Sequence, residues 1–324
     1  MADSQTDIAK ISELRERIQG MQADIGGRVI GSERIVRFMM IAILTENHIL
    51  LEGVPGLAKT KLANEFSRSL GLDFKRIQFT PDMLPTDVMG NYVLNLQTRR
   101  MEFRPGPVFT NVLLADEINR TPPKVQSALL ESMEERQVSS SGERHPLPEP
   151  FFVIATQNPI EQEGTFPLAE ALLDRFLFRY RMTYPSREDE LRAVRSAQGR
   201  EGDRRVYFDA EEIRLLRRSV GSVHISDQVS EYIVDLMRLT RETGGVFLGA
   251  SPRTSVKYLR AVRANALISG REYVLPDDVK SVAHEMLNHR LILEPEMQLE
   301  SGKDPQMVMT AVIADILKSV NVPK

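Results

Sequence analysis

Apolar residues near the start of the chain recur every three or four positions, which places them on one face of a helix: Ile8, Ile11, Leu14, Ile18 and Met21. This spacing predicts an amphipathic helix over residues 1–24 that packs against the main body of the protein. A second helical segment, which begins near Arg34, leads into the first of several strongly apolar runs.

Five short and nearly continuous apolar runs follow, and helical stretches separate them. The runs begin at residues 48, 74, 111, 150 and 175. Runs of this kind are typical of parallel strands that helices cover on both faces. The pattern therefore predicts an α/β core over residues 25–182, built on a mostly parallel five-stranded sheet.

Two polar interruptions inside this core predict inserted β-hairpins. Strand-like pieces flank the turn at residues 97–99, and a second pair flanks the Ser141-Gly142 turn. The first hairpin has a basic side formed by Arg99, Arg100 and Arg104. We interpret these arginines as a hairpin edge that faces solvent.

After residue 185 the strand pattern stops and signals for helix starts follow one another. A Ser or Asp that can accept hydrogen bonds from first-turn amides precedes an acidic residue or a proline at four positions: Ser186, Asp209, Ser251 and Asp304. These signals predict a helical second domain over residues 187–324.

Composition narrows the functional class. A chain of 324 residues with 42% hydrophobic residues, 27% charged residues and a net charge of −3 describes a globular protein without a dominant nucleic-acid surface. The absence of cysteine excludes disulfides and thiolate chemistry, and the 5 histidines lack metal-ligand spacing. No apolar run is long enough to cross a bilayer and the first residues are polar, so we expect a cytoplasmic protein without a transmembrane segment.

The segment GVPGLAKT at residues 53–60 joins the first strand to a helix. It follows the phosphate-loop pattern G-x-x-x-x-G-K-[ST], except that Ala58 stands where the pattern has its second glycine. In such a loop backbone N–H groups meet the phosphates, Lys59 reaches the β and γ oxygens, and Thr60 binds Mg²⁺. Alanine leaves the N–H donors in place if its φ is negative. Glycine-rich turns also occur for purely conformational reasons, so the loop needs support from other residues.

Polar side chains at the ends of two further strands supply that support. Asp116 and Glu117 follow the strand at 112–115, at the edge where open α/β sheets bind ligands. Asp116 is suited to the Mg²⁺ shell through water, and Glu117 to polarising an attacking water. Asn158 follows the strand that begins near residue 151 and could hold the same water, or belong only to the turn before Pro159.

Two arginines are candidates for contact with a nucleotide. Arg175 lies between a helix and a strand, where it could act as an arginine finger toward a neighbouring subunit, or form a surface ion pair with Asp174. Arg253 lies at the start of a helix in the second domain and could bind phosphate, or be an exposed charge.

Taken in order, GVPGLAKT, LLADEINR, ATQNP, LLDRF and SPRT resemble the motifs of the AAA+ ATPases, and among them the MoxR family. The resemblance covers the chain from residue 27 to its end, and alanine before the lysine is usual in MoxR-like loops. The two hairpins resemble the helix-2 insert and the pre-sensor-1 insert of this clade.

The resemblance implies a role for each matching residue. It makes Lys59 and Thr60 the Walker A pair, Asp116 and Glu117 the Walker B pair, Asn158 sensor 1, Arg175 the arginine finger and Arg253 sensor 2. Arg253 could act in its own subunit or in a neighbour. The resemblance also implies nucleotide contacts at the adenine stretch and along the loop: Val29, Ile30, Gly31, Gly53, Pro55, Gly56, Leu57, Ala58 and Lys61.

At the level of function, the resemblance implies an ATPase that binds ATP or ADP with Mg²⁺ and assembles into a ring, usually of six subunits. The ring would remodel or mature client proteins, often together with a partner that carries a von Willebrand factor A domain. In this family the process is frequently the insertion of a metal cofactor into the client. Two alternatives stay open: a nucleotide-gated scaffold with little turnover, and a nucleic-acid motor or chelatase subunit of a neighbouring AAA+ branch. A GTPase is disfavoured because no N-K-x-D motif occurs.

Overall fold

The computed structural model describes residues 2–159, 164–196, 205–300 and 304–323, with side chains described for the same ranges except 2–12, 196 and 298–300. The chain forms two compact units. One comprises Gly20–Phe176 and Tyr180–Arg214, and the other Met1–Gln19, Leu177–Arg179 and Leu215–Lys324.

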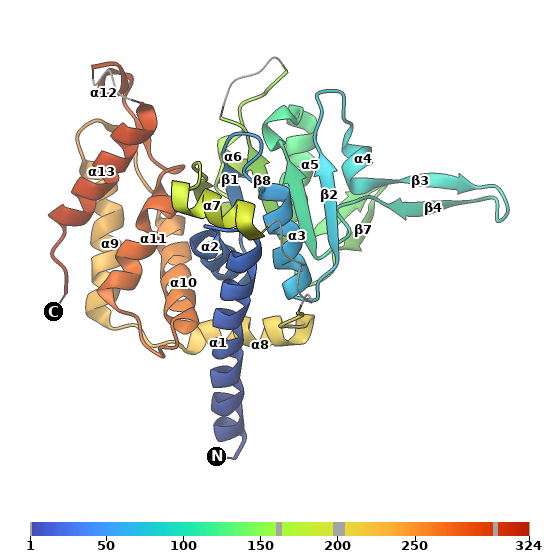
Figure 1. The fold of residues 1–324 in the computed structure, drawn as a ribbon. Helices are drawn as coiled ribbons and strands as arrows, with labels where there is room; N and C mark the ends of the chain where they lie inside the picture. Colours follow the sequence, from blue (N-terminus) through green and yellow to red (C-terminus); the bar gives the residue numbers. More distant parts are fainter. Residues whose placement is uncertain (1, 160–163, 197–204, 301–303, 324) are drawn as a thin grey trace. The chain divides into compact units, whose positions relative to one another are not determined.

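The first half of the chain alternates helices and strands in the order that the apolar runs predict (Figure 1). The helices are α1 (Ala2–Arg28), α2 (Glu33–Leu44), α3 (Lys59–Ser69), α4 (Pro85–Met89), the 3₁₀ turn η1 (Ile118–Arg120), α5 (Pro123–Glu135), α6 (Glu170–Leu173) and α7 (Arg187–Ser196). The strands are β1 (His48–Glu52), β2 (Phe74–Gln78), β3 (Gly90–Asn95), β4 (Arg100–Pro105), β5 (Val112–Asp116), β6 (Gln137–Ser140), β7 (Glu143–Pro146), β8 (Phe152–Gln157) and β9 (Phe176–Arg181).

A central five-stranded sheet has the order β2-β5-β8-β1-β9. Neighbouring strands pair in parallel from β2 through β5 and β8 to β1, with Gln78 opposite Asp116 and Glu52 opposite Gln157. The carboxyl ends of these strands therefore lie along one edge. The predicted mostly parallel five-stranded sheet is confirmed.

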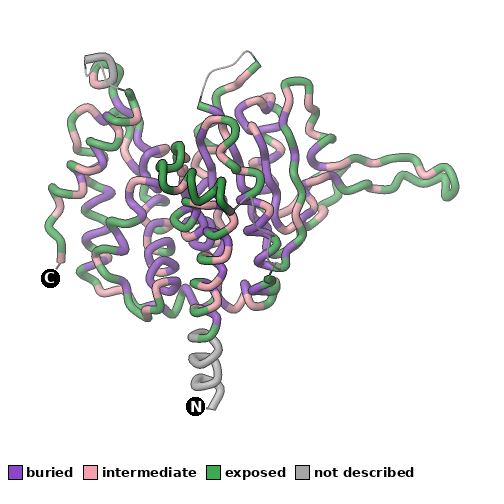
Figure 2. Tube along the Cα trace, in the orientation of Figure 1, coloured by how far each residue is buried: buried purple, intermediate pink, exposed green. Residues whose placement is uncertain are grey.

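Side chains alternate between the two faces of the sheet, and helices cover both. Leu50, Leu113 and Val153 belong to one buried cluster together with apolar residues of α4 and α5. Their neighbours along the strands face the other way. There Phe66 of α3 packs against Phe152 of β8, with ring centroids 6.0 Å apart. Figure 2 shows the strands buried between their covering helices. This burial explains why the five runs are almost continuously apolar.

The two predicted hairpins are present as separate two-stranded antiparallel pairs, β3 with β4 and β6 with β7. The β3–β4 hairpin extends away from the sheet and is largely exposed (Figures 1 and 2). The hairpins touch each other through aromatic side chains: His145 of β7 stacks on Phe103 of β4, with ring centroids 3.8 Å apart. The Tyr92 hydroxyl also donates to Glu143 at 2.5 Å.

The second half of the chain is helical, with one short exception. Its elements are α8 (Ala210–Ser222), α9 (Asp227–Glu242), β10 (Val246–Leu248), α10 (Pro252–Ile268), α11 (Pro276–Leu287), β11 (Ile292–Leu293), α12 (Pro295–Glu300) and α13 (Pro305–Ser319). The exception is the antiparallel pair β10–β11, which is too short for a sequence pattern to reveal.

Helix starts from α7 onward follow the predicted signals. The Ser186 and Asp209 side chains accept hydrogen bonds from the amides of Asp189 and Glu212. The Ser251 and Asp304 side chains do the same for the first turns of α10 and α13. In α1, the predicted apolar residues Leu14, Ile18 and Met21 are buried, whereas the side chains of Ile8 and Ile11 lie outside the described residues. Among the described residues, no helix has the length and apolar character needed to cross a membrane.

Candidate nucleotide-binding site

The loop at residues 53–58 turns sharply between β1 and α3 and is held by close backbone packing. A Cβ atom on Gly53 would lie 3.1 Å from the backbone oxygen of Met182, so glycine is the residue that fits this approach. The Lys59 ammonium donates to the Gly53 carbonyl at 2.5 Å and thereby closes the loop on itself. Phosphate oxygens that reach Lys59 would replace this contact.

Lys59 lies among carboxylates that are far from it in the sequence. Partial burial lowers the pKa of Lys59 below its ordinary value, and the charges of Asp116, Glu117 and Glu52 act in the opposite direction. The structure therefore brings the lysine of the loop together with the acidic pair of β5. Glu52 is a buried third carboxylate that the sequence analysis did not single out.

Ala58 adopts a left-handed backbone conformation, with φ of 55° and ψ of 23°. The amide donors were expected to stay in place if φ at Ala58 is negative, and that condition is not met. A left-handed residue with a Cβ costs roughly 1–2 kcal/mol in strain. The phosphate-loop pattern has glycine at this position because glycine adopts this conformation without strain.

The N-terminus of α3 still offers backbone donors toward the loop. The first hydrogen bond of the helix runs from the Leu62 amide to the Ala58 carbonyl, which leaves the amides of Lys59, Thr60 and Lys61 without a carbonyl inside the helix. Aligned peptide dipoles also favour negative charge at a helix N-terminus. The donor set therefore fits phosphate groups despite the strain at Ala58.

Thr156 of β8 joins the two acidic residues at the end of the neighbouring strand β5. Its hydroxyl accepts from the Glu117 amide at 2.9 Å and donates to Asp116 Oδ1 at 2.5 Å, and the residue is fully buried. A single side chain thus holds the Asp116 carboxylate and the backbone of Glu117. Thr156 could not be identified as a site residue from the sequence alone, because its contacts depend on β5 lying beside β8.

Arg76 of β2 holds the second oxygen of Asp116. Its guanidinium donates twice to Asp116 Oδ2, at 3.0 Å and 2.7 Å. The Asp116 side chain is 11% exposed and that of Arg76 46%. A hydrated Mg²⁺ near Asp116 would therefore approach a carboxylate that is already paired with the Arg76 guanidinium.

Glu117 stands in a strained backbone conformation directly after the strand. Its φ of 56° and ψ of 49° are left-handed, which turns the chain into η1. Its carboxylate pairs with Arg120 at 3.2 Å, and both side chains are about one-third exposed. Backbone strain of this kind costs about 1–3 kcal/mol and is found most often at functional sites.

Asn158 lies at the end of β8, next to the acidic pair. It is 8% exposed, and its carbonyl accepts from the Asn119 side chain at 3.2 Å. Among the described residues, Asn119 Oδ1 is buried without a hydrogen-bond partner. Asn119 of η1 and Asn158 after β8 thus lie in contact, and only Asn158 was expected from the sequence.

Arg175 lies directly before β9, and its guanidinium contacts Glu134 of α5 at 2.9 Å. The sequence analysis considered the adjacent Asp174 as its ion-pair partner; the carboxylate that it contacts belongs to Glu134 instead. The Arg175 side chain is only 18% exposed. Adjacent residues at a helix end point in different directions, which explains why sequence proximity suggested the wrong partner.

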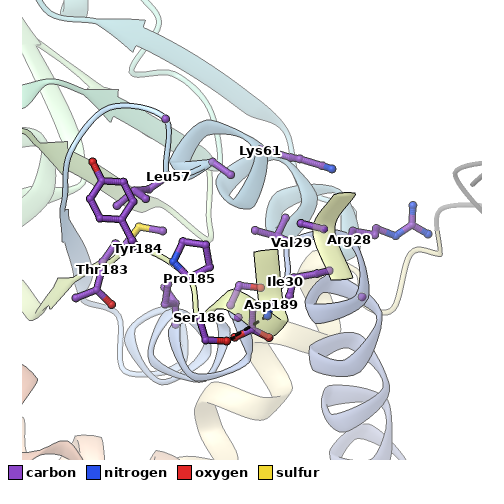
Figure 3. A pocket seen from close by; sticks show the side chains of 18 of the residues that line it. Arg28, Val29, Ile30, Leu57, Lys61, Thr183, Tyr184, Pro185, Ser186 and Asp189 are labelled. Atoms are coloured by element: carbon purple, nitrogen blue, oxygen red, sulfur yellow. Dashed lines mark hydrogen bonds between the residues drawn. The ribbon is translucent and has the colours of Figure 1, made fainter. Parts of the chain in front are cut away.

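A cavity of about 990 Å³ opens beside the loop, within the α/β unit (Figure 3). Its lining includes seven of the predicted nucleotide contacts: Val29, Ile30, Gly31, Gly56, Leu57, Ala58 and Lys61. Gly53, Pro55, Lys59, Thr60 and Asp116 do not line the cavity and lie along the loop and the strand edge instead. The volume is at the upper end of the range for small-molecule sites.

The opposite wall of the cavity comes from the segment after β9, which the sequence analysis did not assign to a site. Tyr184, Pro185, Ser186 and Asp189 line this wall. In Figure 3 Tyr184 lies across the cavity from Val29 and Ile30, whereas Asp189 lies beside Ile30. Such a wall has no motif of its own, since only the fold brings it to the loop.

Arg253 is exposed in the first turn of α10, in the helical unit. Within the described residues, no group of three or more His, Cys, Asp or Glu side chains is arranged to hold a metal ion. The oxygens predicted for Mg²⁺, those of Thr60 and Asp116, are a donor set that suits a nucleotide-bound ion, which takes its other ligands from phosphate and water.

Comparisons with known proteins identify an ATPase domain and a lid domain in the chain. The profile of the ATPase family associated with various cellular activities (AAA) matches residues 48–178, and an AAA lid domain profile matches residues 238–309. The Bacillus subtilis protein named "Uncharacterized protein YeaC" is 45% identical over 298 residues, which make up 91% of each chain.

The chaperone MoxR1 of Mycobacterium tuberculosis is 40% identical over 303 residues, which cover 90% of this chain and 80% of MoxR1. A solved structure of a candidate ATPase from Cytophaga hutchinsonii matches with a TM-score of 0.90 and 39% identity over all of both chains. The resemblance seen in the motifs is thereby confirmed over most of the sequence, and the chain belongs to the MoxR family of AAA+ ATPases.

Proposed function

We propose that this protein hydrolyses ATP with Mg²⁺ in a ring assembly and uses the energy to remodel or mature partner proteins. The observation that carries the proposal is the meeting of Lys59 with Asp116 and Glu117 at the carboxyl edge of the sheet. Membership of the AAA+ ATPases supports nucleotide hydrolysis, and similarity to the chaperone MoxR1 supports action on other proteins.

In this proposal the chain's own residues have separate tasks. Loop amides and Lys59 bind and orient the phosphates, and Thr60 together with Asp116 holds the Mg²⁺ shell, Asp116 through water. Glu117 polarises the attacking water, and Asn158 helps to place it. Mg²⁺ would neutralise charge on the β and γ oxygens.

Arg175 and Arg253 are proposed to contact phosphate, Arg175 across a subunit interface. To do so Arg175 must leave Glu134, its partner in the single chain. Mixing Arg175→Ala subunits with Glu117→Gln subunits tests this directly. Each variant alone should be almost inactive, and mixtures should regain ATPase activity because each subunit supplies what its neighbour lacks. Mixtures that stay inactive at every ratio would contradict a finger acting between subunits.

The partners are part of the proposal. The client would be a protein. A second protein with a von Willebrand factor A domain would act as partner, and the insertion of a metal cofactor into the client is the specific process to test. Glu117→Gln protein held in ATP should retain the client on an affinity column, whereas Lys59→Ala protein, which cannot bind ATP, should not. Equal recovery on both columns would argue against nucleotide-dependent capture.

A scaffold that binds ATP without turnover is the second candidate. The ion pair of Arg175 with Glu134 favours it, because a guanidinium held by its own chain does not reach a nucleotide on a neighbour. Phosphate release separates the two candidates: sustained release supports the ATPase, and tight binding without release supports the scaffold.

A further inference from the structure

The turn η1 begins directly after Glu117 and closes on itself through its own backbone. The Arg120 amide donates to the Glu117 carbonyl at 2.9 Å. The next amide, that of Thr121, donates to the Ile118 carbonyl at 3.0 Å. Glu117 and the residues that follow it therefore form one closed turn, in which a displacement of one residue displaces the others.

This turn is attached to the end of β8 at two points. The Glu117 amide donates to Thr156 Oγ1 at 2.9 Å. Two residues further along both segments, the Asn119 side-chain amide donates to the Asn158 carbonyl at 3.2 Å. The backbone pairing of β5 with β8 ends before these residues, so the two contacts continue the alignment beyond the sheet. One contact would let the turn pivot, whereas two contacts fix its direction.

The Asn119 side chain contributes little to stability for a buried polar group. The residue is 6% exposed, and among the described residues its Oδ1 is a buried acceptor without a hydrogen-bond partner. The gain from the contact with Asn158 is therefore offset by an acceptor that has lost its water. The contact of Asn119 with the Phe166 amide, at 2.7 Å, uses the main-chain carbonyl, which any residue at this position retains. The side chain thus serves the position of Asn158 more than the stability of the fold.

Resting on the proposed function, we propose that Asn119 is a positioning residue for ATP hydrolysis, whose amide holds Asn158 where it and Glu117 reach the same water. In the proposed reaction Glu117 polarises this water and Asn158 helps to place it, so their separation decides whether one water can meet both. Asn119 acts through Asn158 and touches neither the water nor the phosphates. A misplacement of about 1 Å in such a site can lower the rate about a hundredfold.

The competing interpretation is that Asn119 is only a structural link between two neighbouring strands. The chain offers a matched control at the opposite, amino edge of the same strands. There the Asn111 side-chain amide donates to the Pro150 carbonyl at 2.9 Å, and the Asn111 main-chain carbonyl accepts from the Phe152 amide at 2.7 Å. Asn111 Oδ1 also has a partner, the Asp73 amide at 3.4 Å. Asn111 therefore makes the same kind of link between β5 and β8, at the edge away from the catalytic residues.

The test compares Asn119→Ala and Asn111→Ala with wild type on the full chain. Phosphate release gives kcat and KM, competition with a fluorescent ATP analogue gives the ATP affinity, and urea unfolding gives the stability. Asn119→Ala should lower kcat by about tenfold or more and change the ATP affinity by less than about twofold, with a urea midpoint close to that of wild type. Asn111→Ala should show the reverse, an unchanged kcat and a lower urea midpoint, because it leaves the Pro150 carbonyl and the Asp73 amide without their partner.

Two further variants connect the effect to the amide donor and to Asn158. Asn119→Asp keeps the shape of the side chain and replaces the donor with an acceptor, so it should lower kcat at least as much as Asn119→Ala. The double variant of Asn119→Ala with Asn158→Ala should have the kcat of Asn158→Ala alone, since Asn119 acts through Asn158.

The inference is overturned if Asn119→Ala and Asn119→Asp release phosphate at the wild-type rate, or if Asn111→Ala lowers kcat to the same degree. Losses that multiply in the double variant would also overturn it, as would a fall in kcat accompanied by an equal fall in ATP affinity. A wild type that binds ATP and releases no phosphate would overturn the proposed function as well. Failure of the inference alone is recognised by a wild type and an Asn119→Ala variant that hydrolyse ATP equally fast.

Discussion

The buried hydroxyl of Thr156 is the point at which β8 supports both acidic residues of β5, so its removal tests the site as a unit. Thr156→Val keeps the shape of the side chain and replaces the hydroxyl with a methyl group. The Glu117 amide and Asp116 Oδ1 then lose a partner at 2.9 Å and 2.5 Å, respectively. Both groups lie in a buried or partly buried environment.

Leaving a buried polar group unsatisfied costs about 1–3 kcal/mol, so two such groups set a range of about 2–6 kcal/mol. Asp116 retains Arg76, and water reaches Glu117, whose side chain is 31% exposed. We therefore expect a loss near the lower limit, about 2–3 kcal/mol in the free energy of unfolding. Phosphate release should also fall at least about tenfold, because Glu117 is no longer fixed beside Asp116.

Urea unfolding followed by circular dichroism measures the stability, and a coupled phosphate assay measures turnover. Thr156→Ser is the matched control, since it keeps the hydroxyl and loses one methyl group, worth about 1 kcal/mol. It should retain most of the turnover. A valine variant within about 0.5 kcal/mol of wild type and with normal phosphate release would refute the role assigned to this hydroxyl.

Three further changes test other parts of the structure. Ala58→Gly should raise the free energy of unfolding by about 0.5–1 kcal/mol in urea, because glycine adopts the observed φ of 55° without strain; a loss of stability would contradict this. Burial lowers the pKa of Lys59, and bound phosphates should raise this pKa again. ATP binding should therefore take up a proton at alkaline pH, and the affinity for ATP should fall as the pH rises through the lowered pKa of Lys59. Calorimetry in two buffers of different ionisation enthalpy measures this uptake, and identical heats in both buffers would exclude it. Tyr92→Phe removes the hydroxyl that donates to Glu143. Amide hydrogen exchange should then increase over β6 and β7, while β5 and β8 stay protected. Unchanged exchange over β6 and β7 would show that the stacked rings alone hold the hairpins together.

Local signals in the sequence were sufficient to predict the strands, the two hairpins and several helix starts. Asp116 and Asn158 could be assigned to one edge of the sheet because each lies at the carboxyl end of an apolar run. Parallel strands bring these ends to the same edge. Caps such as Ser251 were predictable because the capping residue and the amide it accepts from are three positions apart.

Contacts between distant segments were not predictable in the same way. Arg76 meets Asp116 because β2 lies beside β5 in a particular register, and periodicity reveals a strand but not its neighbour. Asp189 reaches the cavity only through the path of the chain after β9. The conformation of Ala58 was left open by the sequence, since alanine ordinarily prefers a negative φ and the loop imposes a positive one.

The central claim is that Glu117 activates water for ATP hydrolysis at the site formed by the loop and β5. The most direct measurement compares ATP affinity and phosphate release for wild type and Glu117→Gln under the same conditions. The account predicts that the variant binds ATP about as tightly as wild type and releases phosphate at least about a hundredfold more slowly. Phosphate release by Glu117→Gln at the wild-type rate would contradict it.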